Sequence, residues 1–349
     1  MLARAALIEY RQECLSYLAR FCYTARVCFG ACRNFWFASL GVPVRIAVLI
    51  PCFNEEAAVD AVVRSFLAAL PEATIYVYDN NSTDRTPEAA AAAGAVVRRE
   101  TRRGKGHVIQ RMFADVDADV YVLVDGDDTY DAASAPAMIE RLCAEQLDLV
   151  NGARVAASQS AYRPVHRFGN VLLSGLVRCI FGGTITDMMT GFKVFSRRFV
   201  KTFPGPASGF EIDTVLVVHA LALEMPVAEV QVPYRERPAG SASKLRTVQD
   251  GCRVLWTIFR LMTEEHPVYF FGTLTILSAA ASLYFAYPVA MDYLETGRFV
   301  RLPSTLLAGG LMGLSVLFFA FGLILDLVFL SRREGKRLQY LSLSPPPSP

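Results

Sequence analysis

Two long uncharged apolar segments near the C-terminal end constrain this chain more than any other feature of its sequence. One runs from Val268 to Met291 and the other from Ser304 to Leu325, and neither contains Asp, Glu, Lys or Arg. Each exceeds the ~20 apolar residues that a helix needs to cross ~30 Å of hydrocarbon. A buried helix of a soluble protein is the alternative, but two uncharged runs of this length rarely occur in one soluble domain. The segments therefore predict two transmembrane helices.

Basic residues beside these segments predict their orientation. The stretch from Ser331 to Arg337 holds four cations, and four more lie between Lys244 and Arg260, ahead of the first segment. The connection at 292–302 holds two arginines against two acids. Because cytoplasmic loops carry an excess of Lys and Arg, we expect a multi-pass protein of the cytoplasmic (inner) membrane. Both termini, and everything before residue 268, would then lie in the cytoplasm.

The remaining composition argues against several function classes. A net charge of +2 gives no indication of a nucleic-acid partner. The eight cysteines include no C-x-x-C pair. Without a secretory signal, we interpret them as reduced thiols rather than as a disulfide framework or a zinc site. The four cysteines between Cys14 and Cys32 leave lipid attachment or metal binding open there.

The pattern divides the chain into five parts. Residues 1–43 are a basic extension, either an amphipathic helix on a membrane surface or a weakly structured segment. Residues 44–245 alternate apolar strand runs, such as VRIAVLI and ATIYVY, with helical patterns, which predicts an α/β domain with a mostly parallel, Rossmann-like sheet. An amphipathic interfacial helix is expected at 246–266, two transmembrane helices at 267–330, and a basic, proline-rich cytosolic tail at 331–349.

Acidic residues directly follow one of the predicted strands. Asp125, Asp127 and Asp128 come immediately after VYVLV. Acids spaced D-x-D at the end of a strand can bring two carboxylates onto one hard divalent cation beside a diphosphate. Mg²⁺ or Mn²⁺ would there neutralise charge on a departing nucleotide diphosphate. On its own the pattern is also typical of a polar turn whose acids cap the next helix.

Three further polar segments end the strands that precede these acids. PCFNEE, DNNSTDRT and RRGKGH follow the first, second and third predicted strands in turn. Loops at the carboxyl ends of parallel strands meet at one edge of a sheet, so together they favour a nucleotide-sugar pocket. Lys105 lies between two glycines, where it is free to approach a phosphate, and a solvated loop lysine is the alternative. The N-x-[ST] matches in DNNSTDRT would otherwise indicate a glycosylated loop.

These motifs, in this order and spacing, resemble those of the family 2 glycosyltransferases, which have a GT-A-type fold. The resemblance continues through NGAR at 151–154, RFGN at 167–170, DMMTGFKVF at 187–195 and YRERPAGSASK at 234–244. The later motifs, followed by two membrane helices, look most like those of the polyprenyl-phosphate glycosyltransferases. Dolichol-phosphate mannose synthases and undecaprenyl-phosphate glucosyltransferases are members of that group. The resemblance covers about residues 44 to 330.

Carried over position by position, the resemblance implies three groups of site residues. The donor, a UDP- or GDP-sugar, would be bound by Pro51, Phe53, Glu55, Asp79, Lys105 and Asp125. Within that group Asp79 would contact the base, and Asp125 together with Asp127 would hold the metal and the diphosphate. The phosphate of a polyprenyl phosphate acceptor would be bound by Arg154, Arg167, Ser243 and Lys244. Asp187 would lie at the reacting face of the sugar and, with the two arginines, would serve catalysis.

The chain departs from the family's pattern at two places. The common DDGS is DNNS here, which leaves Asp79 as the expected base contact. Dolichol-phosphate mannose synthases often have DADLQ or DADLS where this chain has DGDDT. Either Asp128 or Thr129 would then complete the metal shell.

The mechanism that the resemblance implies follows from the chemistry of its acceptor, a phosphate. The second pKa of a phosphate is roughly 6, so its oxygen is largely anionic at neutral pH and hardly needs a general base. It does need cations that hold it in line with the anomeric carbon, and the planar guanidinium groups of Arg154 and Arg167 suit that task. We therefore expect direct displacement with inversion, with UDP or GDP leaving on the metal.

The role of Asp187 depends on the acceptor. For a hydroxyl acceptor it would be the general base, and for a phosphate it would position the sugar or stabilise developing positive charge. An N-cap ahead of TGFKVF is the structural alternative. Glu211 and Asp213, in SGFEID, either face the sugar or orient a helix.

Two rival functions make different demands on the sequence. A processive or hydroxyl-acceptor polysaccharide synthase of the same superfamily typically carries the motif Q-x-x-R-W. The sequence has two tryptophans, Trp36 and Trp256, and neither ends such a motif. A non-catalytic nucleotide-binding scaffold would have lost the acids that are present here. Gly309 and Gly313 form a G-x-x-x-G, which predicts either close packing within the chain or a homo-oligomer through the membrane helices. The sequence names neither the sugar nor the nucleotide.

Overall fold

The structure is a computed structural model, and it describes residues 44–156, 174–175, 177–178, 185–205, 207–237, 256–257, 259–260, 263, 267–298 and 301–347. The expected extension at 1–43 lies outside these residues, as does most of the expected interfacial helix at 246–266. Three expected acceptor residues, Arg167, Ser243 and Lys244, also lie outside them.

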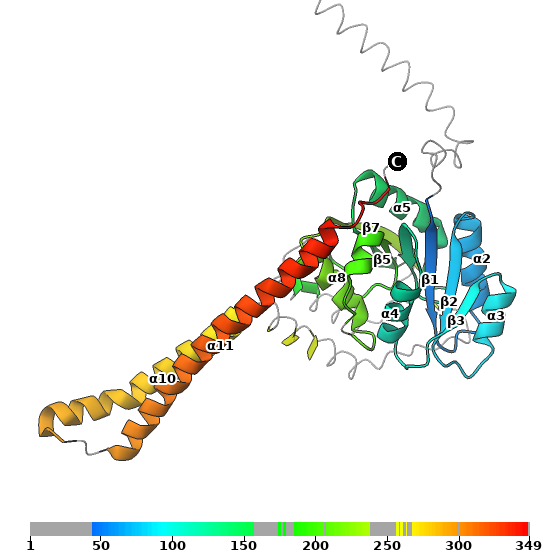
Figure 1. Cartoon of the computed structure of the whole chain (residues 1–349). Helices are drawn as coiled ribbons and strands as arrows, with labels where there is room; N and C mark the ends of the chain where they lie inside the picture. The colour runs from blue at the N-terminus through cyan, green and yellow to red at the C-terminus, as the bar shows by residue number, and fades with distance from the viewer. Residues whose placement is uncertain are drawn as a thin grey trace, which may run out of the picture. The chain divides into compact units, whose positions relative to one another are not determined.

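A seven-stranded sheet forms the centre of the described α/β domain (Figure 1). Its strands, in chain order, are β1 (Ile46–Cys52), β2 (Thr74–Asp79), β3 (Val96–Arg99), β4 (Val120–Leu123), β5 (Leu149–Ala156), β6 (Lys193–Ser196) and β7 (Val227–Tyr234). Across the sheet they lie in the order β3-β2-β1-β4-β6-β5-β7. Neighbouring strands are parallel except where β6 pairs with β4 and with β5. The predicted mostly parallel sheet is thus confirmed, with β6 as its antiparallel member.

Short helices connect the strands. They are α2 (Val59–Ala69), α3 (Thr86–Ala92), α4 (Lys105–Asp115), the 3-10 turn η1 (Ala132–Ser134), α5 (Ala135–Ala144), α7 (Arg197–Thr202) and α8 (Ile212–Ala222). Helix α2 buries Val59, Val62, Val63 and Phe66, which recur at the spacing of one helical face. Helix α8 is apolar on every side and is buried along nearly its whole length. Such helices bury apolar surface against both faces of the sheet, which is why β4 is buried at every position.

The register of the central strands brings their polar ends together. Cys52, the last residue of β1, pairs with Asp79, the last residue of β2. On the other side Leu49 of β1 pairs with Leu123, which ends β4 just before Asp125. The loops after β1, β2 and β4 therefore meet at one edge of the sheet, as the motif spacing predicts.

Two long helices follow the α/β domain in the chain. Helices α10 (Pro267–Thr296) and α11 (Leu302–Leu341) lie side by side as an antiparallel pair (Figure 1). Both are long and apolar enough to cross a membrane. Polar contacts join them: the Ser282 hydroxyl donates to the Ala308 carbonyl at 2.7 Å, and Ser315 donates to Thr275 at 3.0 Å.

The polar end of α11 contacts the α/β domain. The Tyr340 hydroxyl donates to the fully buried carboxylate of Asp148 at 2.7 Å, and the Arg198 guanidinium lies 4.7 Å from the centre of the Tyr340 ring. Arg333 and Arg337 pair with Glu224 at 2.6 and 3.2 Å. The second apolar segment thus continues without a break into a polar helical end that is attached to the domain.

Candidate active site

Asp125 and Asp127, the expected metal ligands, lie together on the turn that follows β4. An oxygen of Asp125 is 2.8 Å from the Lys105 ammonium, and an oxygen of Asp127 is 2.6 Å from the Arg237 guanidinium. Burial, reinforced by the charge of Asp125, raises the pKa of Asp127. Against the effect of burial, Lys105 instead keeps the pKa of Asp125 below its ordinary value. Two neighbouring carboxylates of this kind are a donor set that fits a hard divalent cation.

Asp128 and Thr129, the two residues expected as alternatives to complete the metal shell, differ in their local structure. The Thr129 hydroxyl donates to Asp127 at 2.6 Å, so Thr129 orients one of the two carboxylates. Asp128 has a backbone φ of +57°, a conformation that aspartate tolerates better than most residues. Thr129 is thus bonded to Asp127, and Asp128 lies in the turn; that either of them completes a metal shell stays a prediction.

Two glycines allow the chain to pass directly over these acids. A Cβ atom at Gly191 would lie 2.0 Å from an oxygen of Asp125. A Cβ at Gly126 would lie 2.6 Å from the Cys52 sulfur, which packs under the turn. Both distances are shorter than any real contact, so neither position accepts a side chain without displacement of its neighbour.

Lys105 begins α4 and is neither solvated nor free. Its ammonium contacts Asp125 at 2.8 Å and Asp213 at 2.8 Å, and its side chain is 9% exposed. Burial works to lower the pKa of Lys105, but the charges of Asp125 and Asp213 outweigh it and raise that pKa above its ordinary value. The solvated-lysine alternative is therefore wrong, and Lys105 holds the Asp125 carboxylate in place.

The flanking glycines serve a different purpose from the one the sequence suggests. A Cβ at Gly104 would lie 2.1 Å from the Ser208 carbonyl oxygen, and one at Gly106 would lie 2.3 Å from that of Ala207. The glycines thus allow the 207–208 backbone to approach α4 closely, and the Gly106 N–H donates to the Ser208 carbonyl at 3.1 Å. They position Lys105 through packing rather than by leaving it mobile.

The loops after β1 and β2, which carry the expected donor residues, are joined by hydrogen bonds. The Asn54 N–H donates to the Ser82 hydroxyl at 2.9 Å, and the Glu55 N–H donates to the Thr86 hydroxyl at 2.8 Å. Asp79 accepts from the Ser82 N–H at 3.1 Å and is 4% exposed. Glu55 is likewise buried, and Pro51 and Phe53 are half-buried at the end of β1. The structure therefore brings these expected donor residues together.

The two asparagines of DNNS have structural roles. Asn80 is buried, donates to the Arg102 carbonyl at 2.8 Å and accepts from the Gly104 N–H at 2.7 Å. Asn81 adopts a φ of +63°, where the DDGS pattern has glycine, and donates to the Thr101 carbonyl at 2.8 Å. Asparagine is among the few residues that tolerate this conformation, which explains why it can replace glycine here.

Arg154 and Asp187 form a bidentate ion pair. The Arg154 guanidinium contacts both carboxylate oxygens of Asp187, at 2.7 and 2.8 Å, and lies 5.5 Å from the centre of the Tyr234 ring. Burial works to raise the pKa of Asp187, but Arg154 outweighs it and leaves that pKa below its ordinary value. A carboxylate held in this way is a weak proton acceptor, which favours a positioning role over a general base.

The helix-cap alternative for Asp187 is wrong. Residues 186–191 form a loop, and the strand β6 follows it. Among the other two expected acids, Glu211 accepts from the backbone N–H groups of Ser208 and Gly209 at 3.1 and 2.9 Å, next to the start of α8. Asp213 instead pairs with Lys105, so the two acids have separate roles.

Sequence reasoning missed several residues that hold the 186–191 loop. Glu229 of β7 accepts from the backbone N–H groups of Thr186 and Asp187 at 3.0 and 3.2 Å. The Asn151 amide donates to the Asp187 carbonyl at 2.7 Å, and the Gly191 N–H donates to the Tyr130 hydroxyl at 2.8 Å. Glu229, Asn151 and Tyr130 lie in apolar strand patterns or in a turn. The sequence around a polar residue in such a place does not indicate which residue it will bind.

Comparisons with known proteins show the fold and the family of the chain. The chain has the fold of the glucosyl-3-phosphoglycerate synthase of Mycobacterium tuberculosis, which was crystallised with Mn²⁺, UDP-glucose and phosphoglyceric acid. The two structures match with a TM-score of 0.50 and 24% sequence identity, over 63% of this chain and 80% of that one. This is a GT-A-like fold. A family model, Glycosyl transferase family 2, matches residues 47–203.

Curated relatives lead to the same family. Protein RfbJ of Shigella flexneri is 54% identical over 123 residues, which are 35% of this chain and 95% of that protein. Glycosyltransferase AglJ of Haloferax volcanii is 29% identical over 86% of this chain and 99% of its own length. A dolichyl-phosphate hexose transferase of the same organism is 28% identical over 63% of this chain and 95% of that protein. The chain belongs to glycosyl transferase family 2.

Proposed function

We propose that this protein transfers a hexose-type sugar from a UDP- or GDP-sugar to polyprenyl phosphate, such as undecaprenyl, decaprenyl or dolichyl phosphate. One observation carries the proposal: paired carboxylates and a buried Arg154–Asp187 pair share one sheet edge, in a chain with two membrane-length helices. The relative named a dolichyl-phosphate hexose transferase supports a lipid phosphate as the acceptor. The product would be a lipid-linked sugar that a later transferase uses as its donor.

The donor would lie across the loops after β1, β2 and β4. Asp79 would contact the base, and Asp125 with Asp127 would hold Mg²⁺ or Mn²⁺. The metal, when bound, would neutralise charge that develops on the nucleotide diphosphate. In the structure Lys105 contacts Asp125, and Arg237 contacts Asp127. On donor binding, we expect Arg237 to exchange its contact with Asp127 for one with a phosphate oxygen.

The acceptor phosphate would approach from the side of Arg154, with Arg167, Ser243 and Lys244 proposed to complete its site. Its anionic oxygen would attack the anomeric carbon directly and invert the configuration there, while the nucleotide diphosphate leaves. Because Asp187 binds one edge of the Arg154 guanidinium through its Nε and one Nη, it would fix the plane of that group and thus the line of attack. No proton acceptor is needed in this step.

Membrane attachment is part of the proposal. We place α10 and α11 across the cytoplasmic membrane, with the catalytic domain and the polar end of α11 in the cytoplasm. Among the residues that the structure describes, a Cβ at Gly309, Gly310 or Gly313 would meet no atom within 4 Å, whereas one at Gly322 would lie 3.1 Å from Phe271. The three open glycines support self-association through α11. Chemical cross-linking in native membranes would show a dimer or larger species, which Gly313→Leu would reduce.

The function is tested by incubation of membranes that contain the protein with polyprenyl phosphate, Mg²⁺ or Mn²⁺ and a panel of nucleotide-sugars. We expect one donor to give a lipid-linked sugar, detected by its mass, and Asp127→Ala to lower the rate at least about 100-fold. Asp117→Ala is the matched control, because Asp117 precedes β4 and pairs with surface arginines. Failure of every donor would exclude the function, and full activity of Asp127→Ala would exclude the metal role.

A further inference from the structure

Lys193, the first residue of β6, is a fully buried lysine beneath the candidate site. Its Cα pairs with Leu123 of β4 and with Asn151 of β5, so it lies in the middle of the sheet. Within the part of the chain that the structure describes, no carboxylate forms an ion pair with its ammonium. The mechanism proposed above does not use it.

The ammonium of Lys193 binds the backbone of the 186–191 loop instead. It donates to the carbonyl oxygen of Met188 at 3.3 Å and forms a shorter bond to that of Thr190. At one end of this segment stands Asp187, which orients Arg154. At the other end Gly191 lies against the Asp125 carboxylate, with no room for a side chain between them. Lys193 therefore holds the backbone between the acceptor-side pair and the metal-side acid.

Stability does not explain this residue. An ammonium that leaves water without an ion pair loses several kcal/mol of solvation, and two carbonyl hydrogen bonds recover only part of that. An apolar residue of similar length, such as methionine, would fill the same space at a lower cost. The charge is better explained by what it positions.

The charged groups around Lys193 come from three elements, the 186–191 loop and the turn after β4. Asp213 of α8 and Asp187 of the loop favour its protonated form, while Lys105 of α4 and Arg154 of β5 oppose it. Its own charge in turn acts on Asp125, which follows β4. Burial, the largest influence, lowers the pKa of Lys193 to about 8, so the ammonium is largely charged at neutral pH. The two carbonyl hydrogen bonds fit this charged form.

We propose that Lys193 is a positioning residue for sugar transfer: its ammonium fixes the Met188 and Thr190 carbonyls and so sets the spacing between Asp187 and Asp125. The inference rests on the proposed function. It explains why a buried charge is kept at the start of β6, where the loop enters the sheet. A displacement of reacting groups by about 1 Å can lower a rate about 100-fold, so a small relaxation of this loop would be enough to be measured.

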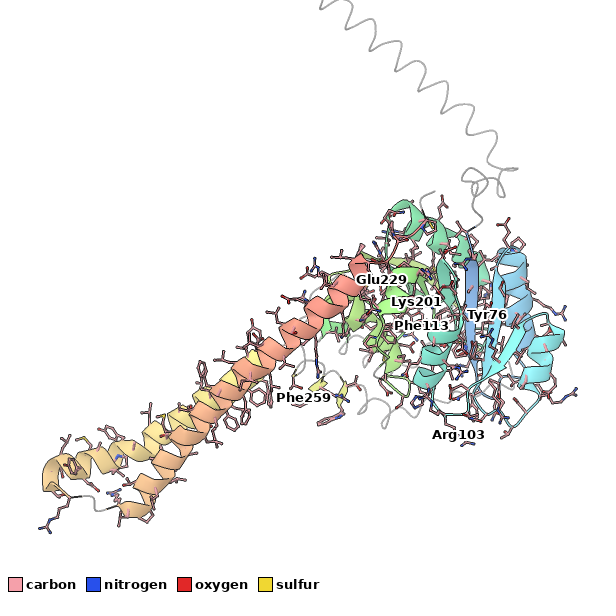
Figure 2. All side chains as sticks on the ribbon, viewed as in Figure 1. Tyr76, Arg103, Phe113, Lys201, Glu229 and Phe259 are labelled. Carbon is pink, nitrogen blue, oxygen red and sulfur yellow. The ribbon has the colours of Figure 1, made fainter. Side chains whose placement is uncertain are left out.

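The test compares three variants of the full-length protein in detergent or vesicles. Lys193→Met removes the charge and both hydrogen bonds at similar volume, and Lys193→Gln restores a neutral donor. Lys201→Met is the matched control, because the Lys201 ammonium also donates to two carbonyls, those of Phe113 and Val116, both at 3.1 Å. Lys201 lies beside Phe113 in Figure 2, on α7 and away from the carboxyl ends of the strands.

We expect Lys193→Met to lower kcat about 100-fold, to change the KM for the nucleotide-sugar less than about 3-fold, and to leave the apparent Tm unchanged or higher. Lys193→Gln should recover part of kcat. Lys201→Met should lower the apparent Tm and leave kcat within about 2-fold. A kcat of Lys193→Met within about 3-fold of the wild type would overturn the proposal, and so would loss of folding or of nucleotide binding in that variant.

The same experiments distinguish a failure of the proposed function from a failure of the proposed role of Lys193. In the first case the wild type itself would form no lipid-linked sugar from any donor. The same kcat ratios would then be measured from the release of nucleotide diphosphate when water accepts the sugar. Equal rates for the wild type and Lys193→Met in that assay would overturn the positioning role independently of the acceptor.

Discussion

Gly191, a residue without a side chain, lies directly against Asp125, one of the two proposed metal ligands. A Cβ there would lie 2.0 Å from an Asp125 oxygen, so Gly191→Ala must push that carboxylate or the loop aside. We expect this variant to lose at least about 10-fold in kcat/KM and to need more Mn²⁺ for half-maximal activity. Titration of the rate with Mn²⁺ measures both effects.

Gly335→Ala is the control for that substitution. Gly335 lies in α11, and a Cβ there would meet no atom of the described part of the chain within 4 Å. Alanine is favoured over glycine in a helix by up to about 1 kcal/mol, so activity and Mn²⁺ dependence should stay at the wild-type level. A Gly191→Ala protein with unchanged Mn²⁺ dependence would show that the Asp125 carboxylate does not bind the metal from this position.

At the residue scale, the acids of the site were predictable and their supports were not. Asp79 and Asp125 stand at or just after the end of apolar strand runs, and this position implies a sheet edge. Glu229 is bonded to Thr186, which lies 43 positions away in the sequence, and it sits in an alternating strand pattern that is typical of a surface residue. Only the three-dimensional pairing of β5 with β7 gives it a partner.

At the scale of elements, helix α8 carries a buried histidine whose protonation opposes folding. His219 packs edge-on against Phe199 and Phe203, and burial lowers its pKa to about 3. The unfolded chain binds this proton below about pH 6.5, whereas the folded chain does not, so stability falls as the pH falls from about 6.5 towards 3. Each pH unit in that window costs about 1.4 kcal/mol.

His219→Leu should remove this contribution to acid sensitivity. Carboxylates still titrate in both proteins, so the difference between their pH profiles isolates His219. Between pH 7 and 5 the apparent Tm of the wild type should fall by several degrees more than that of the variant, measured by circular dichroism in detergent. Parallel profiles would mean that the folded protein can accept the proton on His219.

The direction of β6 was beyond sequence reasoning, although the strand content was not. β1 and β4 are apolar runs that fit buried parallel strands. β6 is equally buried but runs antiparallel between β4 and β5, a choice set by pairs such as Val122 with Val194 rather than by local pattern. The polar end of α11 was also not anticipated as helix, because its contacts with Glu224 and Asp148 are tertiary.

At the scale of the whole molecule, Tyr340 links the last turns of α11 to the catalytic domain. Its hydroxyl donates to Asp148, which also accepts from Ser196 and Arg198, both at 2.5 Å. A hydrogen bond to a charged group contributes about 1.5–3 kcal/mol, so Tyr340→Phe should lower the apparent Tm. It should also speed proteolytic cleavage near residue 340, since the helix end would detach more often.

Tyr287→Phe provides the comparison. Tyr287 lies on α10 and is 68% exposed, so this variant should match the wild type in both measurements. If Tyr340→Phe were cleaved no faster than Tyr287→Phe, the attachment of α11 would depend on Arg333 and Arg337 with Glu224 rather than on Asp148.

The length of α11 has a mechanical consequence. Its 40 residues rise about 60 Å, roughly twice the ~30 Å of hydrocarbon in a bilayer. In the proposed orientation one continuous rod is solvated by lipid at one end and bound to the domain at the other. Bilayers of different thickness change the tilt and depth of such a rod. We infer that, through α11, the thickness of the membrane sets the distance between the membrane surface and the carboxyl ends of the strands. Transfer rates measured in vesicles of graded acyl-chain length would reveal this dependence.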